Sequence, residues 1–515
     1  MAAPESFDVA ILGTGLTECI LAGALARAGK RVLHLDTLDH YGAQLAARHA
    51  ADFLAAVAAL PDSEIGVSSS APQSASDEQP VLGADGDSEA LAAQLAAAPD
   101  AAEWVARLCG DAVPESPERL REARFVASLI ARARHFNLEL VPAVLYSRGP
   151  IVDLLVSSRV GPYLEFKLLN DMFFEWDQEM EKVPSGKDDI FVSKTKDLLA
   201  KRRLMKFLTM ALNYLDNEHA WQEHANRPFC EFLAGQGLDP KMSAVIMHAI
   251  ALVGDADEAA TITTADGLER THRHLNSLGR YGKRAFLVGM YGTGSELCQA
   301  FSRYCAVFGG LYILGFQPDS IESTDEGVCI KGQDQTFVAD SLVVGAEHAA
   351  KLPVPVKLVE TALWRATIIS NAPVLGTTEL SMAALPPQEG ARENGVFAIQ
   401  LSADTCTCPE GLYTVSIISH SSKSTKQDLK DALISLHAHQ ARLQSASVWL
   451  DAVYQIKHIK PETEDAFMDK RIAVCSSPSG QIVLEDHVAE ARRLFERICP
   501  GAIFYPEEAQ PPEDE

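Results

Sequence analysis

Residues 7–36 constrain the fold of this chain most, because they read as an apolar strand, a glycine turn, a helix and a second strand. This order is the dinucleotide-binding fingerprint, in which G-x-G-x-x-G follows a strand and an acid stands about 20 residues further on. Gly13, Gly15 and Asp36 fit the pattern, but Glu18 holds the third glycine position. A carboxylate there suits the helix dipole and would repel a diphosphate. The degenerate fingerprint therefore predicts the fold and argues against the cofactor, which leaves Asp36 to local hydrogen bonds.

Length and charge limit the class of protein further. A chain of 515 residues needs two or more structural units, and no apolar run reaches the roughly 18 residues that cross a bilayer. No signal peptide is visible at the N-terminus, so we expect a cytoplasmic protein whose ten cysteines are reduced, buried thiols. The net charge of −25 disfavours nucleic acid and anionic lipid surfaces as direct partners.

Shifts in composition and periodicity divide the chain into an α/β sheet domain and two inserted segments. Residues 61–116 are rich in Ala, Ser and Asp, which predicts a low-complexity insertion that is either disordered or loosely helical. Apolar residues recur at helical spacing within 183–272, which predicts a smaller helical domain. Residues 506–515 form an acidic, proline-containing tail. The sheet domain is then expected from three stretches: 1–60, 117–182 and 273–505.

Two local patterns suggest a binding surface. Tyr41 and Gly42 form a turn after the second strand, and a glycine-rich segment at 279–310 leads into a helix. On that helix Glu296 and Arg303 are seven residues apart and therefore share one face. Such a pair is either a solvated surface pair or a recognition site, and the spacing alone leaves both interpretations open.

Catalytic motifs are absent from the sequence. It contains no H-E-x-x-H, no G-x-S-x-G and no P-loop, and nothing identifies a nucleophile. The helical segment instead contains several methionines, which indicate either an ordinary core or a soft groove for a flexible lipid chain. The methionines in question are Met205, Met210, Met242 and Met247.

Taken together, the motifs resemble the superfamily of Rab GDP dissociation inhibitors and Rab escort proteins. The resemblance is carried, in order, by LGTGLTECILAGALARAGKRVLHLD, Tyr41-Gly42, KLLNDMFF with EKVPS, GRYGK and MYGTGSEL. It covers nearly the whole chain apart from the insertion. It implies a FAD/NAD(P)-binding-like, flavoprotein-monooxygenase-like fold that no longer uses flavin, in agreement with the Glu18 argument, so the purified protein should be colourless.

Several segments are similar to the escort branch, component A of Rab geranylgeranyltransferase. They include LYSRGPIVDLLV and DDIFVSKTKDLLAKRRLMKFL, as well as the low-complexity insertion. In the second segment Phe191 stands at the position that escort proteins use to dock the prenyltransferase, and Arg202 matches the second docking position. The family's Rab-binding positions correspond to Tyr41, Arg134, Glu296 and Arg303. Ala43 and Ser295 depart from the family pattern, the first replacing a glycine and the second inserted into the usual G-E-L-P turn.

The resemblance implies a chaperone of vesicle transport that is not an enzyme and needs no cofactor or metal. The sheet domain would bind unprenylated, GDP-bound Rab, and the helical domain would dock the heterodimeric transferase and shelter the geranylgeranyl chains. The escort would then deliver the prenylated Rab in a transient membrane contact. Two alternatives are a GDP dissociation inhibitor, which recycles Rab without supporting prenylation, and a flavin-dependent oxidoreductase.

Overall fold

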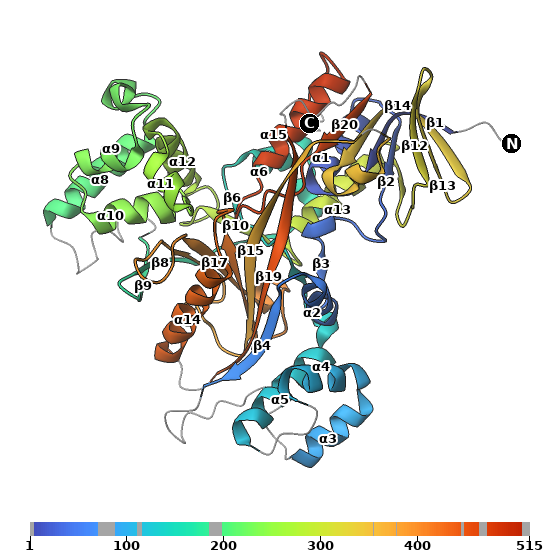
Figure 1. Ribbon diagram of the computed structural model, residues 1–515. Coiled ribbons are helices and arrows are strands. Elements are labelled where there is room, and N and C mark those ends of the chain that lie inside the picture. Colours follow the sequence, from blue (N-terminus) through green and yellow to red (C-terminus); the bar gives the residue numbers. More distant parts are fainter. Residues whose placement is uncertain are drawn as a thin grey trace, which may run out of the picture.

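The computed structural model describes residues 5–70, 88–110, 116–184, 198–353, 355–376, 378–443, 447–462 and 471–506. Figure 1 shows two sheet-containing regions at the upper right and centre, a helical lobe at the upper left and a smaller group of helices at the bottom. The fingerprint lies in the upper-right sheet, and the long strands of the second sheet run from it toward the lower helices.

The fingerprint sheet has the strand order β11-β2-β1-β14-β13-β12, with β20 also paired to β14. The pairs within β11-β2-β1-β14-β20 are parallel, whereas β12 and β13 join in antiparallel fashion. The strands are β1 (Glu5–Leu12), β2 (Val32–Leu35), β11 (Leu311–Ile313), β12 (Ser320–Thr324), β13 (Gly327–Gly332), β14 (Gln335–Gly345) and β20 (Ile472–Cys475).

Both faces of the second half of β1 are buried, as the apolar run from Val9 to Leu12 predicts for a central parallel strand. Val9 and Ile11 belong to a core shared with α1 (Leu16–Arg27), α13 (Thr293–Val307) and α15 (Asp486–Ile498). Ala10 and Leu12 face a second core, built with β12, β13 and β14. The helix of the fingerprint is therefore enclosed between its sheet and two other helices.

The second sheet has the order β4-β19-β15-β18-β17-β16-β8-β9. Its strands are β4 (Glu64–Ser69), β8 (Asp171–Trp176), β9 (Glu179–Lys182), β15 (Leu358–Ser370), β16 (Ser381–Leu385), β17 (Val396–Ser402), β18 (Tyr413–Ser419) and β19 (Val448–Pro461). Helix α14 (Lys426–Leu443) covers one face. Helices α2 (Ala50–Ala59) and α5 (Pro117–Ala131) pack against β19.

Two short sheets and three short helical segments connect these regions. The short sheets contain β6 (Leu145–Tyr146), β10 (Phe286–Gly289) and β7 (Phe166–Leu168), and separately β3 (Ala47–Arg48) and β5 (Leu138–Glu139). The connecting helices are α6 (Pro150–Ser158) and the single turns η2 (Ala133–His135) and η3 (Gly161–Tyr163). They bring parts of the chain that are distant in sequence to the edge of the fingerprint sheet.

The helical lobe has a hydrophobic core of its own. It contains α8 (Leu198–Leu212), α9 (Phe229–Gly235), α10 (Pro240–Ala244), the π-helical stretch η6 (Val245–Ile250), α11 (Ala256–Thr261) and α12 (Thr264–Ser277). The chain thus changes from α to π geometry after Ala244, and α12 continues five residues beyond the boundary at 272 that was expected for the helical domain.

The described part of the insertion at 61–116 contains two helices, in line with the loosely helical interpretation, together with a strand and buried contacts that its composition did not predict. Strand β4 adds to the edge of the second sheet, and α3 (Ser88–Ala97) and α4 (Pro99–Cys109) pack with α5. Leu91, Trp104 and Val105 are buried there, and burying such a side chain stabilises a fold by about 1.5–3 kcal/mol. The alanines that suggested low complexity are also the strongest helix formers. Part of the insertion, and the tail beyond Pro506, lie outside the described residues.

Candidate partner-binding site

Three of the four predicted Rab-binding residues meet in one surface hollow, called here the α13 hollow. Its volume is about 390 Å³. Tyr41 reaches it from the turn after β2, whereas Glu296 and Arg303 reach it from α13. The lining residues are Tyr41, Tyr163, Glu296, Gln299, Ala300, Ser302, Arg303, Ala306, Gly310 and Tyr312. The hollow therefore joins residues more than 250 positions apart in the sequence.

Helix α13 carries the two charged residues of the hollow on one face, as their spacing predicts. Glu296 is half-buried and accepts a hydrogen bond from Gln299 Nε2 at 3.1 Å. Burial raises the pKa of Glu296 above its ordinary value. The exposed guanidinium of Arg303 lies 4.5 Å from the ring centroid of Tyr163. Both charges thus face the opening, where a partner of mixed charge can meet them.

Aromatic rings form the other wall of the hollow. Tyr41 packs edge-on against Tyr312 of β11, with ring centroids 5.7 Å apart. Behind Tyr41 the backbone turns through Gly42 and Ala43, whose φ angles are 96° and 48°. Sequence reasoning missed Tyr163 and Tyr312, because a tyrosine in a short turn or strand has no periodic pattern that indicates its position in space.

Arg134 does not line the α13 hollow. It is exposed in the η2 turn that follows α5. A chain of hydrogen bonds links this region to α13: Asn137 N–H donates to the carbonyl of Thr407, and Tyr291 N–H donates to that of Thr405. Arg134 is thus on an adjoining part of the surface, and its contact with a partner stays a prediction.

The glycine turn of the fingerprint does not fit a dinucleotide, because Glu18 fills it. A Cβ atom at Gly15 would lie 2.6 Å from Oε2 of Glu18, and one at Gly345 would lie 2.6 Å from Oε1. The carboxyl group therefore occupies the space between the glycines where a pyrophosphate would bind. Burial, and the nearby carboxylate of Glu347, raise the pKa of Glu18 well above its ordinary value.

The acid of the fingerprint is likewise occupied within the protein. Asp36 is fully buried and accepts hydrogen bonds from Thr14 Oγ1 at 2.6 Å and from Leu38 N–H at 2.8 Å. It is therefore not available to a ribose hydroxyl, which confirms the local hydrogen bonding expected for it. Side chains of the fingerprint itself therefore fill the position of the nucleotide site.

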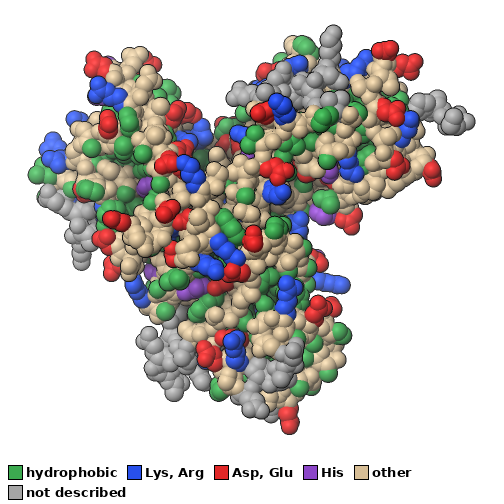
Figure 2. Space-filling model, viewed as in Figure 1, with side chains coloured by type: hydrophobic (Ala, Val, Ile, Leu, Met, Phe, Trp, Pro, Cys, Tyr) green, Lys and Arg blue, Asp and Glu red, His purple; other side chains and the backbone are tan. Residues whose placement is uncertain are grey.

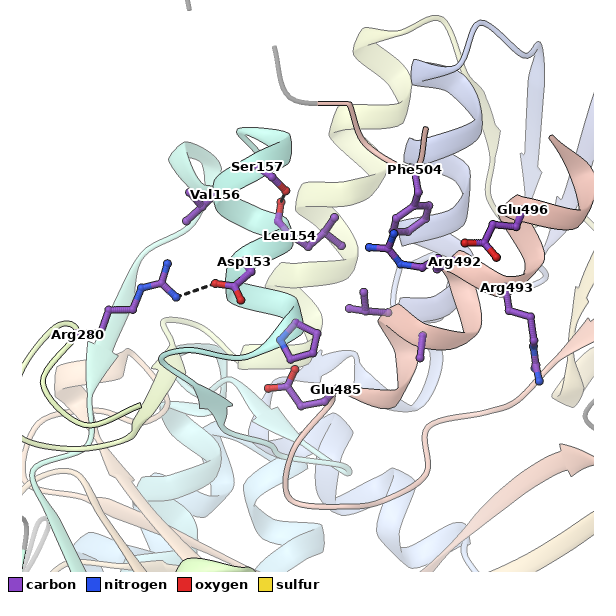
Figure 3. A pocket seen from close by; sticks show the side chains of 13 residues that line it. Asp153, Leu154, Val156, Ser157, Arg280, Glu485, Arg492, Arg493, Glu496 and Phe504 are labelled. Carbon is purple, nitrogen blue, oxygen red and sulfur yellow. Dashed lines mark hydrogen bonds and ion pairs between the residues drawn. The ribbon is translucent and has the colours of Figure 1, made fainter. Parts of the chain in front are cut away.

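A larger hollow of about 760 Å³ lies between α6 and α15 (Figure 3). Leu154 and Phe504 give it an apolar part, and Arg280 at its rim makes a 2.8 Å ion pair with Asp153. Glu485 is almost buried at the start of α15, and this burial raises the pKa of Glu485 to about 7. The lining therefore combines apolar and charged groups. Sequence reasoning did not identify this hollow.

In the helical lobe, the two predicted docking residues differ in what the structure shows. Phe191 lies outside the described residues, whereas Arg202 is exposed on α8. The four methionines belong to one hydrophobic cluster: Met242 and Met247 are 1% and 5% exposed, and Met205 and Met210 are partly buried against it. They fill a core and do not line an open groove, so a lipid chain could enter only if these helices separated.

The described residues also bear on four other features: the distribution of surface charge, metal sites, membrane-spanning helices and the state of the cysteines. On the face shown in Figure 2, acidic and basic side chains are interspersed over both upper lobes. Within the described ranges, no group of three His, Cys, Asp or Glu side chains could hold a metal ion. None of the helices in that part of the chain is long and apolar enough to span a membrane. The ten cysteines are free thiols, although Cys230 is exposed and not buried as expected.

Comparison with known proteins identifies the family. The pattern of the GDP dissociation inhibitor family matches residues 3–60 and 117–500, so the chain belongs to this family. Its function is therefore that of the Rab escort proteins and GDP dissociation inhibitors. The unmatched residues 61–116 coincide with the insertion that contains β4, α3 and α4.

Two curated relatives represent both branches. The chain is 31% identical to "Rab proteins geranylgeranyltransferase component A" of Drosophila melanogaster, over 99% of this chain and 92% of that protein. It is 27% identical to "Probable secretory pathway GDP dissociation inhibitor 1" of Schizosaccharomyces pombe, over 80% of both chains. The resemblance to the superfamily that includes escort proteins is thereby confirmed.

Solved structures confirm the fold class. A Rab GDI from Plasmodium falciparum superposes with a TM-score of 0.70 at 20% identity and covers 97% of this chain and all of its own. An oxidoreductase from Methanosarcina mazei superposes with a TM-score of 0.53 at 12% identity, over 95% of this chain and all of its own. At these identities the similarity concerns the fold alone. The prediction of a FAD/NAD(P)-binding-like α/β fold is correct.

Proposed function

We propose that this protein is a Rab escort protein. It binds unprenylated, GDP-bound Rab in the cytosol, presents it to Rab geranylgeranyltransferase and carries the prenylated product to membranes. The observation that supports this most is the α13 hollow, which brings Tyr41, Glu296 and Arg303 together on an exposed surface. A hollow with aromatic walls and one charge of each sign has the composition of an interface that selects a protein partner.

We propose a non-catalytic role within the transferase complex. In this account the chemistry belongs to the transferase heterodimer, and the escort supplies only binding and orientation. The relative from Drosophila melanogaster is named as a component of that transferase, which supports this division. The closed fingerprint site supports it as well, because Glu18 and Asp36 leave no room for the dinucleotide that an oxidoreductase of this fold would need.

The helical lobe would supply the other two activities. Phe191 and Arg202 would dock the transferase, and Arg202 has the exposure that this requires. The methionine cluster would admit the geranylgeranyl chains once its helices separate. Such burial is favourable, because leaving a prenyl chain in water costs a free energy of roughly 0.8 kcal/mol for each exposed CH₂ group. A photoreactive prenyl probe should then label the helical lobe, and labelling of the sheet domain alone would exclude this shelter.

Reconstituted prenylation separates the escort role from its nearest alternative. Purified transferase, geranylgeranyl diphosphate and unprenylated GDP-bound Rab are mixed with or without this protein. An escort makes Rab prenylation depend on its addition, whereas a GDP dissociation inhibitor binds Rab and leaves prenylation at its background rate. Flavin absorbance of the purified protein would instead favour the oxidoreductase alternative.

A further inference from the structure

Glu139 is a buried residue whose carboxylate lies against the N-terminus of α13, outside the α13 hollow. It is the second residue of β5, and its side chain is 7% exposed. The carboxylate accepts backbone N–H hydrogen bonds from Thr293 at 3.1 Å, Gly294 at 2.9 Å and Ser295 at 3.1 Å. A helix leaves its first four N–H groups without intrahelical partners, so one distant side chain satisfies most of the first turn of α13.

The start of α13 has no local cap. Gly292 precedes the helix with a φ of 114°, and it offers no side chain to the free N–H groups. A Cβ atom at Gly292 would lie 3.0 Å from Cδ of Glu139, so the glycine leaves room for the carboxylate. Ser, Thr, Asp and Asn are the residues whose side chains usually cap such N–H groups. The position and order of this helix start therefore depend on Glu139.

Glu139 also connects α13 to the turn that carries Tyr41. Strand β5 pairs with β3, and Glu139 lies opposite Ala47. Leu45, between Tyr41 and β3, packs against the first turn of α13, where a Cβ atom at Gly294 would lie 2.8 Å from its Cδ2. The turn, the short sheet and the helix start thus form one packed unit around the carboxylate.

The segment that carries Arg134 is tied to the same unit. Arg134 stands shortly before β5 in the chain, and Asn137 Nδ2 donates to the carbonyl oxygen of Cys406 at 2.7 Å. The loop of Cys406 in turn accepts the backbone N–H of Tyr291 through Thr405 at 2.9 Å. All four predicted Rab contacts are therefore on segments that meet around Glu139.

We infer that Glu139 is a positioning residue for Rab binding, which fixes the start of α13 and so places Glu296 and Arg303 relative to Tyr41 and Arg134. This inference rests on the proposed function. Glu139 itself is buried and need not touch the partner. Burial raises the pKa of Glu139 to about 7, while its three backbone hydrogen bonds favour the ionised form. Both carboxylate oxygens are acceptors, so replacement by an amide removes the charge and turns one acceptor into a donor.

The test compares two substitutions at this position with a matched control. GDP-loaded Rab is titrated into the full-length wild-type protein and into the variants Glu139→Gln, Glu139→Ala and Asp428→Asn. Asp428 is the matched control, because it is a buried carboxylate in the first turn of α14, away from the hollow, and accepts the backbone N–H groups of Glu393 and Thr425. We expect about tenfold weaker Rab binding for Glu139→Ala, a smaller loss for Glu139→Gln and little change for the control.

A double substitution shows whether Glu139 acts through the hollow. If it positions α13, adding Arg303→Ala to Glu139→Gln weakens binding by less than the product of the two single losses. A fully multiplicative loss, or wild-type Rab affinity in both Glu139 variants, would overturn the inference. Since Glu139→Gln is isosteric, its result stands even if Glu139→Ala fails to fold. A wild-type protein that does not bind GDP-loaded Rab would instead refute the proposed function itself.

Discussion

Two neighbouring sites on the fingerprint sheet have opposite properties. The glycine turn holds Glu18 and is closed, whereas the α13 hollow beside it is open to solvent. Thr14 connects the two, since its hydroxyl donates to Asp36 and its carbonyl accepts the N–H of Gly42 next to Tyr41. The comparison shows that a single side chain within a glycine turn can prevent the turn from binding a nucleotide. The same strand–turn–helix scaffold can still position side chains that bind a protein partner.

A third region, the helical lobe, should act independently of both sites, and this gives the largest expected effect. Phe191→Ala should abolish transferase binding and leave Rab binding intact, because an interfacial aromatic anchor can contribute about 2–4 kcal/mol. Pull-down assays with each partner measure the two activities separately. Equal loss of both would show that docking and Rab binding are not separate functions.

Arg303→Ala tests the open site itself. We expect Rab binding to weaken by about 2 kcal/mol, because the variant removes the guanidinium, which supplies a positive charge to the hollow and also covers the ring of Tyr163. Calorimetric titration with GDP-loaded Rab measures the loss. Arg442→Ala is the matched control, since Arg442 is an exposed arginine in the last turn of α14. Similar affinities for both variants would remove the α13 hollow from the interface.

Glu18→Gln tests the closed site through the pH dependence of stability. The pKa of Glu18 is raised in the folded protein, above the value near 4.3 of an unfolded glutamate. Its contribution to stability is therefore full below about pH 4 and is lost as the pH rises toward the raised pKa, at about 1.4 kcal/mol for each unit crossed. The glutamine variant cannot ionise.

The expected outcome is a difference in melting temperature that shifts in favour of Glu18→Gln between about pH 5 and about pH 8. Thermal unfolding of both proteins across this range measures it. Parallel curves would mean that Glu18 is not held in a proton-binding, buried position. Rab binding by the variant should match that of wild type, because Glu18 lies outside the α13 hollow.

Ala43→Gly gives the smallest effect. Ala43 has a φ of 48°, in the left-handed region that favours glycine. The substitution should relieve strain and stabilise the fold by up to about 1 kcal/mol, partly offset by the greater freedom of glycine in the unfolded chain. Chemical denaturation measures the change. A destabilised variant would show that the methyl group of Ala43 contributes packing that outweighs the strain.

The sequence predicted what depends on local patterns. The fingerprint indicated the first strand–turn–helix unit, and the spacing of Glu296 and Arg303 correctly placed them on one face of a helix. Glu139 and Tyr163 could not be identified in this way, because their roles arise from contacts between segments far apart in sequence. Composition at 61–116 allowed loose helices but did not indicate strand β4 or the buried side chains, such as Trp104, that anchor the alanine-rich helices.

The most direct measurement is a titration of GDP-loaded Rab into the purified protein, with and without an excess of FAD. The account predicts a colourless protein that binds Rab with the same affinity in both titrations, because the closed turn excludes the flavin and the hollow remains free. Saturable FAD binding together with no binding of Rab would contradict the central claim that a closed nucleotide site lies beside an open protein-binding surface.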